Sequence, residues 1–111
     1  MTSEESTLEP TISVEVERNG SGCVVRVTGD LEFATAPALG DAVTELLRER
    51  VDPLVVDLGP LVFIDSTGLR LLVQSKQQTE AQGQRFALRN LNARTRRVFD
   101  LAGMLDEFSI E

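Results

Sequence analysis

The chain has 111 residues, of which 41% are hydrophobic and 26% charged, a balance typical of one globular domain with a single core. Its formal net charge of −7 argues against a nucleic-acid partner, because phosphate backbones are held by clusters of lysine and arginine. The sequence has no histidine, which excludes Ser-His and Cys-His catalytic dyads and histidine metal sites. We therefore expect no enzyme activity, no metal and no cofactor.

The start of the chain, residues 1–10, is polar and acidic, unlike the basic start and apolar stretch of a signal peptide. We expect it to be a disordered tail in front of a single domain that spans residues 11–111. No apolar run is long enough to cross a bilayer. The single cysteine, Cys23, cannot form an internal disulfide and is expected to pack as a small hydrophobe. These features predict a cytoplasmic protein that does not bind membranes.

The first third of the chain predicts a hairpin followed by a helix. From Thr11 apolar and polar residues alternate, which indicates a half-buried strand with one face exposed to solvent. The Asn-Gly step within residues 18–22 is typical of a hairpin turn, so residues 23–31 would return antiparallel to the first strand. Thr35 is then expected to cap a helix that begins around Pro37, where a missing N–H costs little.

The rest of the chain alternates between strands and helices. The nearly continuous apolar run at residues 54–58 predicts a central strand that is covered on both faces. A second helix is expected from about Ser66 to Gly83, with its later, polar turns facing solvent. Residues 85–91 predict a fourth strand, residues 92–104 a third helix, and residues 106–110 a short final strand.

This order of elements predicts an α/β fold. Strand-helix-strand units imply parallel pairing with right-handed crossovers, whereas the opening hairpin is antiparallel. We therefore expect a mixed sheet of four to five strands, with an antiparallel first pair, a parallel remainder and flanking helices. The third helix is expected to bury Val98, Phe99, Leu101 and Ala102.

The stretch "FIDSTGLRLL", residues 63–72, places a serine inside the most apolar part of the chain. In the predicted topology Ser66 lies near the carboxyl end of the sheet, at or next to a helix N-terminus, where ligands and modifications tend to sit. It could be a nucleophile, a helix cap, a ligand contact or a modification site. A nucleophile is disfavoured, because the only lysine, Lys76, lies on an expected solvated helical face.

On local chemistry alone a cap is the favoured role for Ser66, and Thr67 could share it, because most serines in front of helices act as caps. A phosphate on Ser66 would instead meet the unpaired amides of the helix start, with Gly68 allowing close backbone approach. Asp65 would oppose that charge, or orient the hydroxyl for transfer. The apolar run at residues 61–64 is expected to be core, with a docking patch as the alternative.

Three segments together resemble one known family. Residues 61–72, "LVFIDSTGLRLL", are similar to the characteristic motif of the STAS domain, in particular that of bacterial anti-sigma factor antagonists. Residues 27–39, "VTGDLEFATAPAL", resemble the family's Gly-Glu-Leu-Asp strand end and the helix after it, although "GDLE" exchanges the usual Glu and Asp. Residues 94–104, "RTRRVFDLAGM", resemble its Arg/Lys-x-hydrophobic-Phe-x-x-Gly segment. The three matches occur in the family's order.

The resemblance implies a STAS-like fold with Ser66 as the phosphorylation site. It implies that the unphosphorylated protein binds an anti-sigma factor with serine kinase activity and thereby frees a sigma factor. Phosphorylation of Ser66 would end that binding, and a serine phosphatase would restore it. The positions that the resemblance implies for partner and kinase binding are Asp30, Glu32, Asp65, Thr67, Gly68 and Leu69.

Two other classes of function compete with this one. The first is a non-switching STAS adaptor subunit of a transporter or signalling assembly, in which Ser66 only caps the helix. The second is an enzyme or small-ligand carrier, which the lack of histidine and of a Gly-rich phosphate loop disfavours. The sequence ends at Glu111, where many STAS relatives have a further helix, so we expect a partner or a second copy, as in a homodimer, to cover the bare surface.

Overall fold

The fold was analysed on a computed structural model, which describes residues 9–111. The predicted tail at residues 1–10 therefore lies outside the described residues, apart from Glu9 and Pro10. The strands are β1 (Ile12–Asn19), β2 (Gly22–Leu31), β3 (Leu54–Asp57), β4 (Leu61–Ile64) and β5 (Phe86–Arg89). The helices are α2 (Ala36–Arg48), α3 (Ser66–Ala81), α4 (Ala93–Leu101) and the short 3-10 helix η1 (Leu105–Glu107).

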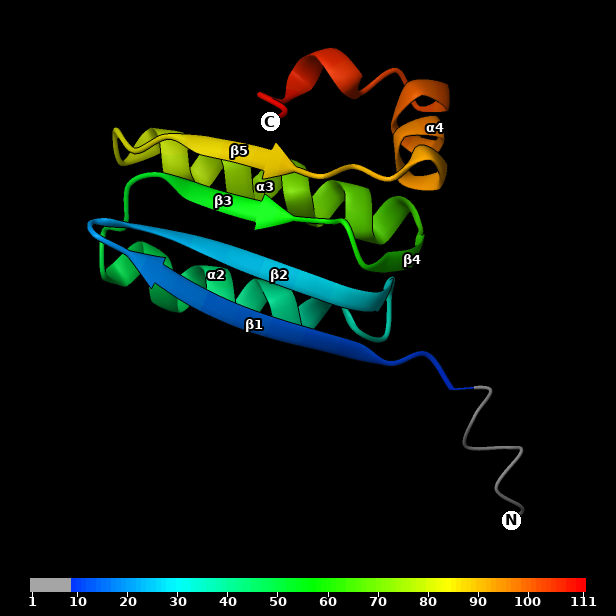
Figure 1. The fold of residues 1–111 in the computed structure, drawn as a ribbon, viewed down its shortest axis with the longest axis horizontal. Coiled ribbons are helices and arrows are strands. Elements are labelled where there is room, and N and C mark those ends of the chain that lie inside the picture. Colours follow the sequence, from blue (N-terminus) through cyan, green and yellow to red (C-terminus); the bar gives the residue numbers. More distant parts are fainter. Residues whose placement is uncertain (1–8) are drawn as a thin grey trace.

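The strands form one mixed sheet in the order β1-β2-β3-β5, with β4 paired to the end of β2. The first pair is antiparallel, and β2–β3, β3–β5 and β2–β4 are parallel, which confirms the predicted architecture. Helices α2 and α3 lie side by side against one face of the sheet, and α4 packs on β4 at the end where β3 and β5 finish (Figure 1). The carboxyl ends of the parallel strands, β4 and α4 therefore share one end of the molecule.

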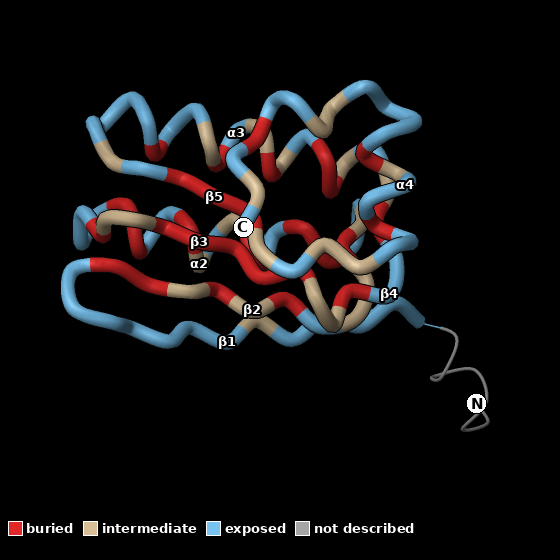
Figure 2. Tube along the Cα trace, turned by 45° about the horizontal axis from the view of Figure 1, so that its top comes forward, coloured by how far each residue is buried: buried red, intermediate tan, exposed pale blue. Residues whose placement is uncertain are grey.

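The core lies between the sheet and the two long helices. Every residue of β3 is buried, as expected for a strand with neighbours on both sides, and Val56 is completely inaccessible to solvent. Figure 2 shows buried residues along β2, β3 and β5, whereas the edge strand β1 is mostly exposed. Cys23 is buried as predicted, and burial raises the pKa of its thiol. The buried side of α2 consists of Ala36, Leu39, Val43, Leu46 and Leu47.

Strand β4 was not among the predicted strands. It follows β3 after a short turn, and it pairs with β2 beyond a register shift between Gly29 and Asp30. Its first and last residues, Leu61 and Ile64, are in the core, and the two residues between them are exposed. A run of four apolar residues is too short to show the periodicity of a strand. Its pairing partner, β2, also lies more than thirty residues earlier in the chain, so local sequence cannot indicate the pairing.

The C-terminal region differs from the prediction in two ways. The expected strand at residues 106–110 is replaced by η1 and a single bridge between Leu88 and Ile110. Helix α4 buries Phe99, which contacts Phe108 edge to face at 5.6 Å between ring centroids, but Leu101 and Ala102 are exposed. The helix ends at Leu101, so its last residues extend past the surface that it covers.

The second half of α3 is polar but not entirely solvent-facing. Ser75 and Thr79 are buried, and their hydroxyls donate to the carbonyl oxygens of Leu71 and Ser75 at 2.8 and 2.7 Å. Because these hydroxyls are satisfied by the helix's own backbone, they can face the sheet without an unpaired polar group.

We expect Val56→Asp to prevent folding, because it buries an unpaired charge in the central strand. Circular dichroism should show no cooperative thermal transition. The matched control is Val16→Asp, on β1, where the side chain is 37% exposed and the carboxylate can reach water. A cooperatively folding Val56→Asp protein would contradict the position of β3.

Candidate functional site

Ser66 is the first residue of α3, directly after β4, and it is exposed. The helix cap is not Ser66 but Asp65, whose extended backbone lets its Oδ1 accept a hydrogen bond from the amide of Gly68 at 2.9 Å. The favoured local interpretation of Ser66 as the cap is therefore wrong. Within residues 9–111 the Ser66 hydroxyl has no hydrogen-bond partner, so it stands free at the helix start.

The Asp65 carboxylate also joins two distant parts of the chain. Its Oδ2 accepts a hydrogen bond from the amide of Phe33 at 3.2 Å, and its own amide donates to the carbonyl of Leu31 at 3.3 Å. Because both carboxylate oxygens accept amide hydrogens, Asp65 fixes the shape of the loop. These bonds place the loop after β2 beside Ser66.

The β2–α2 loop has an internal hydrogen-bond network. Thr35 precedes α2, as predicted, but its hydroxyl does not cap the helix. It donates to the Asp30 carbonyl at 2.6 Å and accepts from the Glu32 amide at 3.0 Å. The Glu32 carboxylate accepts from the Ala34 amide at 2.7 Å. Of the two acidic residues predicted for the partner-binding edge, Asp30 therefore lies at the end of β2 and Glu32 in the hydrogen-bonded loop that follows, and both are half-buried.

Gly68 and Leu69 lie on the inner side of the helix start. A Cβ at Gly68 would come within 2.5 Å of the Leu31 carbonyl oxygen and 2.9 Å of Ile64 Cγ1. Leu69 is only 8% exposed and belongs to the core cluster. Their side-chain positions are thus closed to a partner, and these two residues can influence recognition only through the shape of the loop. Thr67 remains half-exposed.

Exposed apolar side chains surround this end of the molecule. Phe33 is 78% exposed, Val62 54% and Phe63 51%. The sequence left residues 61–64 as either core or docking patch, and each interpretation fits half of them. The first and last residues of the strand are buried, and the two middle residues are exposed. Phe33 was missed by the sequence analysis. Its only signal is a large aromatic residue inside a polar loop.

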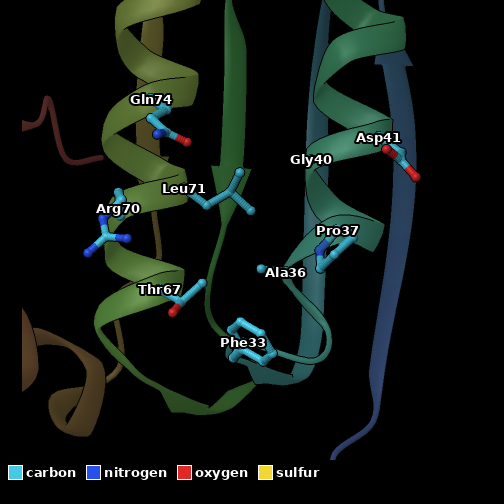
Figure 3. A pocket seen from close by; sticks show the side chains of 9 residues that line it. All are labelled: Phe33, Ala36, Pro37, Gly40, Asp41, Thr67, Arg70, Leu71 and Gln74. Atoms are coloured by element: carbon cyan, nitrogen blue, oxygen red, sulfur yellow. The ribbon is translucent and has the colours of Figure 1, made fainter.

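An open groove runs between α2 and α3 from this loop (Figure 3). It has a volume of about 410 Å³, and Phe33 stands at its mouth with Thr67 on the α3 wall. The other residues that line it are Ala36, Pro37, Gly40, Asp41, Arg70, Leu71 and Gln74. The groove is mainly apolar, with one carboxylate and one guanidinium on opposite helices.

The described residues meet the requirements of neither a metal site nor a membrane-spanning helix. Within residues 9–111 no three cysteine or acidic side chains are grouped so that they could hold a metal ion. None of the helices in that range combines the length and hydrophobicity needed to cross a bilayer.

Comparison with known proteins identifies the family. The STAS domain profile matches residues 13–111. The anti-sigma-B factor antagonist of Bacillus subtilis (strain 168) is 31% identical over 99 residues, which cover 89% of this chain and 90% of the relative. The chain therefore belongs to the STAS domain family.

Solved structures show the same fold. The crystal structure of an anti-sigma factor antagonist from Mycobacterium paratuberculosis has a TM-score of 0.82 at 29% identity, and the match covers 90% of this chain and 85% of that one. The phosphorylated form of the Bacillus cell fate determinant SpoIIAA has a TM-score of 0.69 at 20% identity, with 89% and 91% of the two chains covered. The second similarity is evidence for the fold alone.

We expect Gly68→Ala to destabilise the domain by about 1–3 kcal/mol, because the added methyl group collides with the Leu31 backbone. Gly40→Ala is the matched control within α2. There the nearest atom, Leu71 Cδ1, is 3.5 Å away, and alanine should gain about 0.5–1 kcal/mol from its helix propensity. Urea unfolding of both variants measures the difference. Equal stabilities would contradict the close approach at Gly68.

Replacing Asp65 should separate its two roles. Asp65→Ala loses both hydrogen bonds and should cost about 0.5–2 kcal/mol for the cap alone. Asp65→Asn keeps one acceptor oxygen, so its stability should lie between the wild type and Asp65→Ala. Ser66→Ala, at an exposed residue, should change stability by less than about 0.5 kcal/mol. A larger loss for Ser66→Ala than for Asp65→Ala in urea unfolding would show that serine is the cap.

Proposed function

We propose that this chain is an anti-sigma factor antagonist that is switched by phosphorylation of Ser66. In its unmodified form it binds an anti-sigma factor with ATP-dependent serine kinase activity and so releases a sigma factor in the cytoplasm. The family membership and the names of the similar proteins support this proposal. A serine phosphatase would regenerate the binding form.

The observation that carries the proposal is the free hydroxyl of Ser66. It is exposed, it has no hydrogen-bond partner within residues 9–111, and the capping is done by Asp65. In the transfer, the bond between the γ-phosphorus of ATP and its bridging oxygen breaks, so that ADP leaves. A new bond forms from the phosphorus to Ser66 Oγ. The hydroxyl proton passes to a base on the kinase. Because the cap is the Asp65 carboxylate and not that hydroxyl, the modification leaves the helix cap in place.

The surroundings of Ser66 explain how phosphate would end binding. The exposed side chains of Phe33, Val62 and Phe63 supply an apolar surface of the kind that proteins use to dock. A phosphoserine adds about −1.5 to −2 charges, which must stay hydrated or find counter-charges. Next to Asp65 and among apolar contacts this charge opposes association, whereas the positive end of α3 tolerates it within the domain.

The remaining predicted contacts surround the same point. Asp30 and Glu32 would flank the partner on the β2 side, and Thr67 on the α3 side, with Gly68 and Leu69 holding the loop in shape. Asp65 links the β2–α2 loop to the start of α3 through its two hydrogen bonds. It therefore fixes the position of Ser66 relative to these contacts. Binding and phosphorylation would therefore use one surface.

Exchanging Ser66 should reveal the switch. We expect Ser66→Ala to capture an ATP-binding anti-sigma kinase from the cytosol of the source organism, and Ser66→Asp to bind it about a hundredfold more weakly, which corresponds to about 3 kcal/mol. Affinity capture with mass spectrometry identifies the kinase, and calorimetry with the purified kinase gives the ratio. The matched control is Ser109→Asp, which adds the same charge at an exposed serine outside the site and should bind like the wild type.

The alternative function predicts the opposite result. A non-switching adaptor would bind the same membrane or assembly proteins with both Ser66 variants, at equal affinity. Circular dichroism of Ser66→Asp must first show an intact fold, so that lost binding reports the added charge. Equal capture by two folded variants would contradict the proposed switch.

A further inference from the structure

Arg70 is an exposed cation one helical turn after Ser66. It lies on α3 and lines the groove between α2 and α3. Within residues 9–111 it forms no ion pair and no side-chain hydrogen bond, whereas Arg18, Arg85 and Arg89 are each paired with a carboxylate at 2.8–3.1 Å. The fold therefore does not use the charge of Arg70.

The helix geometry directs this side chain towards Ser66. Residues four apart on a helix have Cβ atoms about 5–6 Å apart, and helical side chains lean towards the N-terminus. Ser66 is N-terminal to Arg70 by this spacing, so a long guanidinium side chain spans the distance to a group on Ser66 Oγ. Figure 3 shows Arg70 one turn beyond Thr67, close to the start of α3.

Within residues 9–111 none of the carboxylates near this point forms an ion pair with Arg70. Both oxygens of Asp65 accept backbone amides. The Glu32 carboxylate accepts the Ala34 amide, and Asp41 on the opposite helix is too far from Arg70 for an ion pair. From the α4 side, the Arg94 guanidinium donates to the Val62 carbonyl at 3.3 Å.

We propose that Arg70 binds the phosphate of phosphorylated Ser66 on the outer side of the first turns of α3, beside the groove between α2 and α3. This inference rests on the proposed function and adds the residue that receives the new charge. A guanidinium and a phosphate form two parallel charge-assisted hydrogen bonds, which are stronger and more directional than neutral ones. No carboxylate within residues 9–111 has to be displaced for this pair to form.

The pair would change the docking surface as well as its charge. The phosphate would lie on the exposed turn of α3 that carries Ser66 and Arg70, adjacent to Thr67 on the groove wall. A partner that docks over this end of α3 would then meet a hydrated ion pair in place of a neutral hydroxyl. The change would need no movement of the helices.

The test is ³¹P NMR on the full chain with phosphoserine installed at position 66 during translation. A neighbouring cation favours the dianionic phosphate, so Arg70 should hold the second phosphate pKa below its ordinary value of about 6. We expect Arg70→Gln to raise that pKa by roughly half a unit or more, and Arg70→Lys to restore part of the difference. Thermal unfolding should also show that phosphorylation stabilises the wild type more than Arg70→Gln.

Two matched controls complete the experiment. Arg48→Gln, at the far end of α2, and Arg94→Gln, on α4, remove equal charges and should leave the phosphate pKa unchanged. An unchanged pKa in Arg70→Gln, or a shift in Arg94→Gln instead, would overturn the proposal. Because no kinase is needed to install the phosphate, this result is independent of the binding experiment on Ser66, and the two proposals can fail separately.

Discussion

The shared carboxylate of Asp65 is the interaction on which the site depends. One oxygen satisfies the Gly68 amide at the start of α3, and the other accepts the Phe33 amide from a loop 32 residues earlier. An aspartate can do this because its two oxygens accept from different directions, whereas a serine side chain offers a single oxygen. Since Asp65 performs the capping, the serine that follows is free.

The residues that follow Asp65 fall into two groups, one packed inside the domain and one exposed to solvent. Gly68 is packed against the Leu31 backbone and Leu69 against the core, so the inner side of the helix start is part of the domain's packing. Ser66 and Thr67, on the outer side of the same turn, reach solvent. A chemical change on the outer side therefore leaves the packing intact, which is what a binding switch in a domain of this size requires.

The sheet topology brings the rest of the surface to the same place. Parallel strands end together, so the end of β2, the short strand β4 and the start of α3 meet at one end of the molecule (Figure 1). Their exposed apolar residues, the groove between α2 and α3, and Arg70, which has no ion pair within residues 9–111, lie around Ser66. The proposed recognition and its proposed reversal by phosphate would thus use one surface.

The sequence by itself determined the features that depend on neighbours in the chain. Alternation and an Asn-Gly step determined the hairpin of β1 and β2, an apolar run determined β3, and the motif at residues 63–72 determined a serine at a helix start. The tertiary structure decided what depends on distant partners: the pairing of β4 with β2, the loss of a final strand, the exposure of Phe33 and Leu101, and the choice of Asp65 over Ser66 as the cap. Local patterns record the period and propensity of a segment, whereas burial and hydrogen-bond partners are set by residues that come together only when the chain is folded.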